Sequence, residues 1–410
     1  MPMVTSLETA LTPWVAQLKN RANLPVLLQW GEHPSPESGL RLGDFEQPRV
    51  VIRVSKTAAV PKLLSPSLDS LGEAYVEGLI DVEGSVEDIL EMAHRLAEAG
   101  SGTESRLTRI VRHLQHSKKS DEEAVQYHYD VSNDFYQAWL DPRMVYSCAY
   151  FENGDETLEE AQLKKIDHIL TKVQLRPDQR LLDIGCGWGA LVIRAAQKFG
   201  ARCVGITLSQ RQFELASERV RAAGLQDRVE IRLQDYRDVQ GPFDRITSVG
   251  MFEHVGLDYL QGYFARIREL LADEGWVLNH GITSTDANDG ETSHGGGRFI
   301  DRYVFPQGEL PHISTVLKNL QAGGLEALDV ESLRRHYART TALWSQAFEA
   351  AGEKLRALVD ERRWRIWRVY LAGCQWAFEH DEISLYQVLC RKAGLQARDL
   401  PWSRRWMYPR

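Results

Sequence analysis

Cysteine is scarce in this 410-residue sequence, and no segment is apolar for long enough to cross a bilayer. The five cysteines are odd in number and have no CxxC or zinc-like spacing, which argues against a disulfide framework and a zinc site. No stretch approaches 18 uninterrupted apolar residues, so no transmembrane helix is predicted. The first residues lack the charged segment and apolar run of a signal peptide. We therefore expect reduced thiols and a cytoplasmic location.

An excess of positive charge is also absent. Lysine and arginine total 49 against 57 aspartates and glutamates, a net charge of −8, so the whole molecule shows no tendency to bind nucleic acid. The hydrophobic fraction of 43% and the charged fraction of 26% are ordinary for a soluble globular protein. A chain of this length can form one large domain and a smaller one with a sizeable core.

Residues 1–115 are predicted to form a small α+β domain. Apolar runs at 24–30 and 49–55 indicate short strands, and the pattern at 85–100 indicates a helix that ends at a glycine. The small, polar stretch at 100–105 marks a domain boundary. This part of the chain contains no catalytic constellation.

Two segments combine basic residues with a pattern that leaves more than one interpretation open. Residues 106–120 form either a solvated connecting helix or a contact with anionic lipid. The terminal 400–410 interleaves arginines with tryptophan and tyrosine, which suits a membrane interface, the alternative being stacking on a nucleic acid. Before it, the helical spacing of Trp364, Trp367 and Leu371 indicates a stripe that faces a core.

From about residue 178 the pattern alternates between strands and helices. Strands are predicted at 180–185, 201–207, 228–235, 243–250 and 275–283, with helices at 190–200 and 209–224. Such alternation implies parallel βαβ units in an open α/β sheet. Ligands of such sheets bind at the carboxyl ends of the strands, where the motifs described next are found.

The sequence "LLDIGCGWGAL" places four residues of interest between a strand and a helix: Asp183, Gly185, Gly187 and Gly189. Glycines allow a sharp turn and a close approach of the backbone to a ligand. The GxGxG spacing, with an acid two positions earlier, differs from the dinucleotide fingerprint GxGxxG. It resembles the S-adenosylmethionine-binding motif of Rossmann-like methyltransferases, the alternative being a generic glycine turn.

Two further strand ends fit such a cofactor. Asp235 follows the third strand, where a carboxylate can accept a hydrogen bond from the adenine amino group. After the second strand, "GITLSQRQ" contains no acid for the ribose hydroxyls. Thr207, Ser209 and Gln212 are therefore expected to bind the ribose instead.

A single cysteine, Cys148, lies between two tyrosines in "VYSCAYF". Taken alone, it is a candidate nucleophile, metal ligand, redox switch or lining residue. A zinc site is the weakest of these interpretations, because the cysteines have no CxxC or zinc-like spacing.

Five blocks together extend the comparison to a family: "HYDVSNDFYQAWLDPRMVYSCAYF", "LLDIGCGWGAL", "GITLSQRQ", "SVGMFEHVG" and "RYVFPQGELPHIS". They resemble the cyclopropane-fatty-acid synthases from about residue 127 to the C-terminus, and "LGEAYVEGLIDVEG" resembles the first domain of that family more loosely. The resemblance implies a Rossmann-like class I methyltransferase sheet with a smaller N-terminal α+β domain. It further implies methyl transfer to a cis double bond of a phospholipid acyl chain, after which bound bicarbonate removes a proton and a cyclopropane ring closes.

The resemblance also assigns residues. The bicarbonate site would consist of Cys148, Glu253, His280, Ile282 (through its backbone) and Tyr337. The S-adenosylmethionine site would consist of Tyr146, Ser147, Asp183, Gly185, Gly187, Gly189, Thr207, Leu208, Gln212 and Asp235. In this arrangement Cys148 is a wall of the anion site rather than a nucleophile, and no metal is expected.

The resemblance also implies an organisation and leaves alternatives. Residues 1–115 would dock on lipid and 116–410 would catalyse, in a possible homodimer attached to the inner face of the membrane. The same methyl transfer ending in a methylene or methyl branch remains open. So do methylation of a small soluble amine and a non-catalytic lipid-binding protein.

Overall fold

The computed structural model describes residues 2–30, 39–99, 131–287, 297–304, 309–396 and 400–408, with only the backbone for 2–10. The chain forms two compact units. Unit 1 comprises Met1–Arg112, Glu291–Val304 and Val359–Trp376, and unit 2 comprises His113–Gly290, Phe305–Leu358 and Ala377–Arg410. The expected boundary between residues 115 and 116 and the basic segment 106–120 lie outside the described residues. Two later segments of the chain thus belong with the N-terminal residues.

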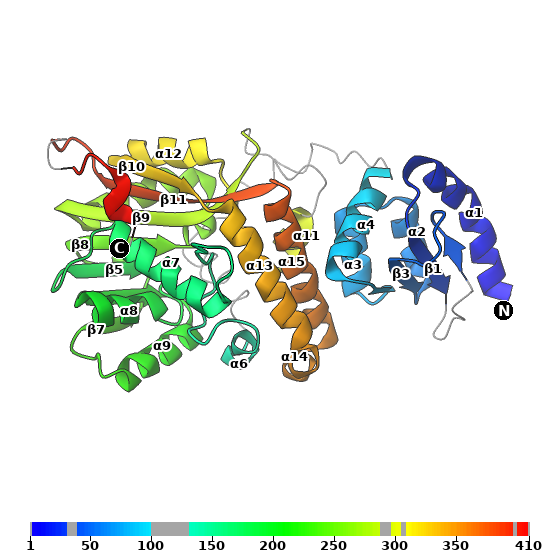
Figure 1. The fold of residues 1–410 in the computed structure, drawn as a ribbon, viewed down its shortest axis with the longest axis horizontal. Helices are drawn as coiled ribbons and strands as arrows, with labels where there is room; N and C mark the ends of the chain where they lie inside the picture. The colour runs from blue at the N-terminus through cyan, green and yellow to red at the C-terminus, as the bar shows by residue number, and fades with distance from the viewer. Residues whose placement is uncertain are drawn as a thin grey trace. The chain divides into compact units, whose positions relative to one another are not determined.

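Unit 1 contains a four-stranded sheet with the order β2-β1-β3-β4. Its elements are α1 (Pro2–Ala22), β1 (Val26–Trp30), β2 (Leu40–Arg41), β3 (Val50–Val54), η1 (Thr57–Ala59), α2 (Val60–Leu64), α3 (Leu68–Val76), β4 (Ile80–Glu83), α4 (Val86–Ala99), α11 (Gly297–Tyr303) and most of α15 (Glu361–Glu379) (Figure 1). The two strands and the helix predicted before residue 100 are confirmed.

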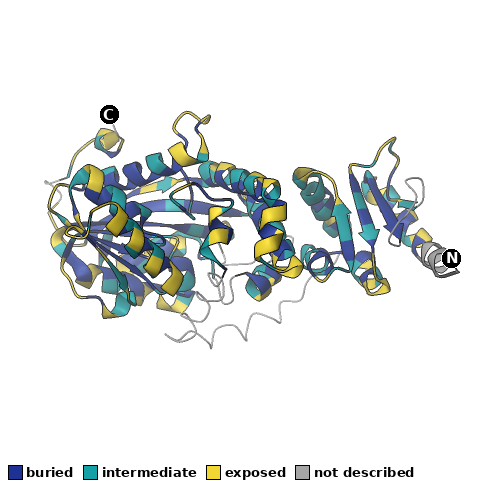
Figure 2. Cartoon of the chain, turned by 90° about the horizontal axis from the view of Figure 1, so that it is seen from below, coloured by how far each residue is buried: buried dark blue, intermediate teal, exposed yellow. Residues whose placement is uncertain are grey.

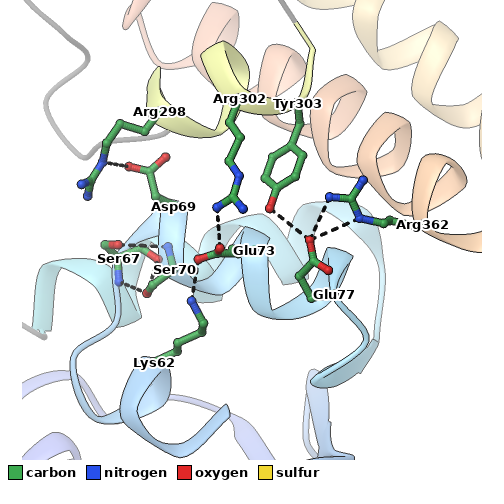
Figure 3. Close-up of polar contacts among 10 residues, drawn as sticks. All are labelled: Lys62, Ser67, Asp69, Ser70, Glu73, Glu77, Arg298, Arg302, Tyr303 and Arg362. Carbon is green, nitrogen blue, oxygen red and sulfur yellow. Dashed lines mark hydrogen bonds and ion pairs between the residues drawn. The ribbon is translucent and has the colours of Figure 1, made fainter. Parts of the chain in front are cut away.

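Charged contacts join α3 to the two later helices of unit 1, as Figure 3 shows. One face of α3 and the residue after it carry three carboxylates spaced one turn apart, those of Asp69, Glu73 and Glu77. Arg298 and Arg302 of α11 contact the first two, at 3.4 and 2.6 Å. Arg362 of α15 contacts Glu77 at 3.0 Å. The predicted core-facing stripe on α15 is confirmed, because Trp364, Trp367 and Leu371 are buried.

Unit 2 contains a seven-stranded sheet with helices on both faces (Figures 1 and 2). Its elements are α6 (Asn133–Gln137), α7 (Leu158–Lys172), β5 (Arg180–Ile184), α8 (Ala190–Phe199), β6 (Arg202–Thr207), α9 (Gln210–Ala222), β7 (Val229–Leu233), η3 (Tyr236–Asp238), β8 (Phe243–Val249), η4 (Phe252–His254), η5 (Leu257–Tyr259), α10 (Leu260–Leu270), β9 (Leu271–Ser284), α12 (Ile313–Ala322), β10 (Leu325–Ser332), α13 (Arg334–Ala350), α14 (Gly352–Leu358), β11 (Ile383–Lys392) and η7 (Arg404–Met407).

The strand order of this sheet is β10-β11-β9-β8-β5-β6-β7. Strands β5 to β9 are parallel, as predicted, whereas β11 is antiparallel to both β9 and β10. This arrangement confirms the expected Rossmann-like methyltransferase fold. The two antiparallel strands are an addition that the alternation between residues 178 and 284 does not reveal.

Each face of the sheet packs against its own set of helices. Side chains alternate along a strand, so Trp276 and Leu278 join the core under α7 and α8, while Val277 joins the core under α10 and α12. Figure 2 accordingly shows the strands of this unit as largely buried. The sheet is therefore a rigid support whose strand ends hold the loops of the site.

The C-terminal residues pack on unit 2 rather than standing free. Trp406 meets Trp276 edge to face at 5.1 Å between ring centroids, and Met407 is buried. Trp402, in contrast, is fully exposed. None of the helices in the described ranges is long and apolar enough to cross a membrane.

Candidate active site

A cavity of about 380 Å³ opens at the carboxyl ends of the parallel strands of unit 2. Its walls come from the segments that follow β5, β6, β7 and β8, together with α7 and residues 144–147. Strands β6 and β7 follow on one side of β5 in the sheet, whereas β8 lies on the other side of β5. Open α/β sheets bind ligands at such a switch point in the strand order. The position and size of the cavity suit a nucleoside cofactor.

Nine of the ten predicted cofactor residues line this cavity: Tyr146, Ser147, Asp183, Gly185, Gly187, Thr207, Leu208, Gln212 and Asp235. Gly189 is not among the lining residues. It precedes α8 with a φ of 85°, and a Cβ there would lie 3.2 Å from Ala216. Ser209, which was expected to bind the ribose, instead accepts a hydrogen bond from the amide of Gln212 at the start of α9.

The glycine turn after β5 has a backbone that other residues rarely adopt. Gly185 and Gly187 have φ values of 80° and 52°. A Cβ on Gly187 would have no protein atom within 4 Å and would project from a wall of the cavity. The missing side chain therefore leaves room for a cofactor, which is the fit that the motif predicts.

Gly187→Ala should weaken S-adenosylmethionine binding about tenfold or more, because the added methyl occupies cofactor space. Gly224→Ala is a matched control, since Gly224 has a φ of 65°, an equally open surrounding and a position away from the cavity. Both variants should lose about 1–2 kcal/mol of stability through backbone strain. Calorimetric titration should show the loss of affinity for Gly187→Ala alone, and equal affinities would contradict the cofactor site.

Hydrogen bonds fix the loops that face the cofactor. The Thr207 hydroxyl donates to Gln212 Oε1 at 2.7 Å and accepts from the amide of Ser209. The Asp235 carboxylate accepts from the Arg237 guanidinium at 2.6 and 2.8 Å. These contacts hold neutral polar groups after β6 and an acid after β7, as predicted.

Lys165 is a lining residue to which none of the sequence motifs points. It lies on α7, is 2% exposed, and donates from Nζ to the Ser147 hydroxyl at 2.6 Å. Burial lowers its pKa to about 8, and burial raises the pKa of nearby Asp183 to about 6. A helical pattern could have revealed it, since Lys165 falls on the apolar stripe that contains Ala161 and Ile169.

Glu253 lies directly after β8 and reaches across to β9. Its Oε1 accepts a hydrogen bond from the backbone amide of Ile282 at 2.7 Å. Strand β8 ends at Val249, opposite His280, so it provides no ladder partner for this amide. Burial raises the pKa of Glu253 to about 7, and its Oε2 has no hydrogen-bond partner in the described part of the chain.

The close approach of η4 to β9 depends on Gly281. A Cβ at this position would lie 1.8 Å from Cε1 of the buried Phe252 ring. Glycine thus allows Glu253, the next residue after Phe252, to reach the strand.

Gly281→Ala should therefore lower the free energy of unfolding by about 1–3 kcal/mol, the usual cost of overpacking. Gly373→Ala serves as the control, since a Cβ on this α15 glycine meets nothing within 4 Å. Denaturant melts of both variants give the comparison, and an unchanged midpoint for Gly281→Ala would show that η4 can move away freely.

His280 lies two residues before Ile282 on β9, so both side chains project from the same face of the sheet. Its Nδ1 contacts Gln387 Nε2 at 3.2 Å, while its Nε2 is buried without a partner among the residues described. Burial, with nearby Lys165 and Lys172, lowers its pKa well below the usual value, so the ring is neutral at pH 7. A buried donor or acceptor without a partner is costly, which makes both this nitrogen and Glu253 Oε2 candidates for ligand contacts.

The Cys148 thiol and the Tyr337 backbone amide donate hydrogen bonds to the same backbone carbonyl. The Cys148 thiol donates to the carbonyl of Leu333 at 3.8 Å, and the Tyr337 amide donates to the same oxygen at 3.0 Å. The amide of Leu333 in turn donates to the carbonyl of Leu385, which pairs with Ile282. Hydrogen bonds and one ladder pair therefore connect four of the five residues predicted for the bicarbonate site, and His280 lies on the same strand.

Aromatic contacts also link this group to the cofactor cavity. Trp344 lies 5.2 Å from the Tyr146 ring, which lines the cavity, and 5.9 Å from the Tyr337 ring. Tyr337 stacks on Phe378 at 4.4 Å. Within the described ranges, no three His, Cys, Asp or Glu side chains form a group that could hold a metal ion.

Comparisons with known proteins agree with this geometry. The family model for mycolic acid cyclopropane synthetase matches residues 116–388, and a domain of unknown function (DUF7884) matches residues 14–104. A probable fatty acid methyltransferase of Pseudomonas putida is 46% identical over 364 residues, covering 88% of this chain and 92% of that protein. Cyclopropane mycolic acid synthase 1 of Mycobacterium tuberculosis is 38% identical over 279 residues, covering 65% and 96%.

A solved structure shows the same likeness in three dimensions. The crystal structure of mycolic acid cyclopropane synthase CmaA1 complexed with SAH and CTAB has a TM-score of 0.63 and 38% identity, and the match covers 66% of this chain and 98% of that one. The glycine turn and the cavity described above lie within residues 116–388, which the family model matches. The chain therefore belongs to the mycolic acid cyclopropane synthetase family, and it is an S-adenosylmethionine-dependent methyltransferase related to cyclopropane synthases and fatty acid methyltransferases.

Proposed function

We propose that this enzyme converts the cis double bond of unsaturated phospholipid acyl chains into a cyclopropane ring, with bound bicarbonate as the general base. One observation carries this proposal: Glu253 Oε2 and His280 Nε2 are buried polar atoms without a partner in the described structure, one able to accept and the other able to donate. A bicarbonate ion has one O–H and two charged oxygens, so an ion bound between the two atoms would satisfy both. The site therefore matches the chemistry of this anion.

The residues of the chain divide the work between cofactor and base. When bound, S-adenosylmethionine supplies the methyl group that the double bond accepts. In its ionised form Glu253 would accept the O–H of bicarbonate, and neutral His280 would donate to a charged oxygen, while the Ile282 backbone amide holds the carboxylate in place. Held by these residues, the anion would supply the base that takes a proton from the newly attached carbon before the ring closes.

Cys148 forms a wall of this site. It is fully buried, and burial raises the pKa of its thiol above the ordinary value, so it remains protonated at neutral pH. Nucleophiles of this type need a thiolate, which usually requires a nearby positive charge and some exposure. Of the four interpretations open for this cysteine, the lining role fits best.

The aromatic rings beside the cavity suit a cationic transition state. Tyr146 lines the cavity and packs against Trp344, and ring faces attract positive charge. An apolar, aromatic surrounding of this kind would also accommodate an acyl chain. These side chains therefore fit a lipid substrate.

The experiment that tests the proposed function is product analysis. The enzyme is incubated with S-adenosylmethionine and vesicles of oleoyl phospholipid, and the lipid is examined by mass spectrometry and proton NMR. High-field cyclopropane protons are expected. Olefinic methylene or methyl-branch signals would instead identify the other outcome of the same transfer, and cofactor binding without any lipid turnover would revive a non-catalytic role.

We further propose that residues 1–115 dock the enzyme on the inner face of the membrane and that the enzyme acts there, in a homodimer. The exposed ring of Trp402 fits an interfacial location. Cosedimentation of the full chain with anionic and with neutral vesicles tests the docking, and sedimentation velocity tests the dimer. Failure to pellet with either kind of vesicle would contradict a membrane-bound state.

A further inference from the structure

We propose that Lys172 and Gln387 are positioning residues that fix His280 as the neutral tautomer with its proton on Nε2, aimed at the bound anion. The inference deepens the proposed function, since it assigns the direction of one hydrogen bond in the bicarbonate site. It rests on a chain of three buried side chains. Gln387 is 0% exposed, and His280 and Lys172 are each 1% exposed.

Two contacts connect these three side chains in order. Lys172 Nζ, at the end of α7, lies 3.2 Å from Gln387 Oε1. The Nε2 atom of the same amide lies 3.2 Å from His280 Nδ1. Gln387 and His280 are also direct partners in the β11–β9 ladder, so the backbone holds the two side chains in register.

The chemistry of the donors sets the proton positions one after another. A lysine ammonium has three donors and no acceptor, so the Gln387 atom that it contacts must be the carbonyl oxygen. The amide NH₂ group then faces His280 and can only donate, so Nδ1 must accept. A neutral imidazole that accepts at Nδ1 carries its proton at Nε2.

Acidic partners hold Lys172 in place. Its Nζ lies 2.8 Å from Glu331 and 3.3 Å from Asp329, both on β10. Although burial opposes ionisation of Glu331, hydrogen bonding from His168 and the charge of Lys172 lower its pKa to about 2. The two carboxylates thus balance the positive charge of Lys172, and they hold its ammonium group in a fixed direction toward the Gln387 amide.

The position of the proton matters at His280, the last of the three side chains. His280 Nε2 is the buried nitrogen without a partner in the described structure, and a proton there makes it a donor. The opposite tautomer would present a lone pair to an anion and repel it. Because burial also lowers the pKa of His280, the ring acts as a neutral donor and not as the base.

The direct test is the tautomer of His280 in the wild-type holoenzyme. Nitrogen-15 NMR of ring-labelled histidine, with the signal assigned by its loss in His280→Asn, distinguishes the two ring nitrogens. We expect Nε2 protonated and Nδ1 unprotonated across pH 6 to 8.5. A proton on Nδ1, or a ring that titrates within this range, would overturn the inference.

A pair of variants on one helix tests the role of Lys172. Lys172→Met should release the Gln387 amide, mix the two tautomers, and raise the bicarbonate concentration for half-maximal rate about tenfold, the scale of one hydrogen bond to a charged group. Lys164→Met, on the same helix but paired with Glu152 and Glu156, should change neither quantity. Equal behaviour of both variants would count against the proposal.

Gln387→Glu provides a second test that does not depend on removing a charge partner. A carboxylate accepts from Lys172 and from the ring alike, so the proton should move to Nδ1.

If wild-type turnover is indifferent to bicarbonate while Nε2 is protonated, the proposed function fails and the tautomer assignment stands. If turnover depends on bicarbonate while Nδ1 carries the proton, the tautomer assignment alone fails.

Discussion

Glu253→Gln should reduce kcat by about 10²–10⁴-fold, the contribution of a positioned base, while the affinity for S-adenosylmethionine stays unchanged. The amide can still accept from the Ile282 backbone, but its NH₂ group cannot accept the O–H of bicarbonate at the second position. The anion would then lose the partner that orients it. Single-turnover kinetics and calorimetry separate the two quantities.

The same substitution should affect stability in the opposite direction from activity. The pKa of Glu253 rises from 4.5 to about 7 on folding, so the folded state binds its proton more tightly than the unfolded state. Wild-type stability should therefore fall as pH rises from about 4.5 to 7, and the variant should lack this loss of roughly 3 kcal/mol. Glu274→Gln, at an exposed position, is the control. A variant that is both active and less stable would contradict the assigned role.

Lys165→Met should raise the free energy of unfolding at pH 7 by about 1–3 kcal/mol and weaken cofactor binding about tenfold. The pKa of Lys165 falls from 10.5 to about 8 on folding, because burial penalises the charged form. At pH 7 the side chain is charged in both states, so the fold bears this cost, and the stability of the wild type should rise between pH 8 and 10.5. Methionine removes the cost but also the charge that holds Ser147 and faces the cavity.

A substitution that raises stability but weakens cofactor binding identifies a residue that is retained for function. Lys164→Met, one position earlier on α7 and in a surface ion-pair cluster, should leave cofactor affinity unchanged. Thermal melts and calorimetric titration give both quantities. Lower stability together with normal affinity for Lys165→Met would mean that this lysine is structural.

The cofactor loop could be predicted from the sequence because its signal is local. Gly185 and Gly187 are in one turn, and the strand and helix on either side have clear periodicity. The bicarbonate site is different, because Cys148, Glu253 and Tyr337 come from a loop, a short helix and α13. Only a resemblance to a family could group them in advance, and the structure then supplies the carbonyl and ladder contacts between them.

Residues behind the site were missed for a physical reason. His168 and Lys172 lie one turn apart on α7, and both are buried. Such a pair of basic residues looks like part of a solvated face until the strands that cover it are known. Strands β10 and β11 provide that cover, and their antiparallel pairing joins parts of the chain about 60 residues apart.

The grouping of helices in unit 1 is likewise non-local. The charges that attach α11 and α15 to α3 are separated by more than 220 residues in sequence. No pattern along the chain reports such contacts.

Turnover in carbon-dioxide-free buffer, with and without added bicarbonate, is the measurement that decides whether an anion completes this pocket. Wild-type enzyme on oleoyl phospholipid vesicles should be nearly inactive without bicarbonate and should recover as the ion is added, whereas Glu253→Gln should stay slow throughout. Full activity of the wild type in the absence of bicarbonate, or of Glu253→Gln in its presence, would show that Glu253 and His280 hold no catalytic base.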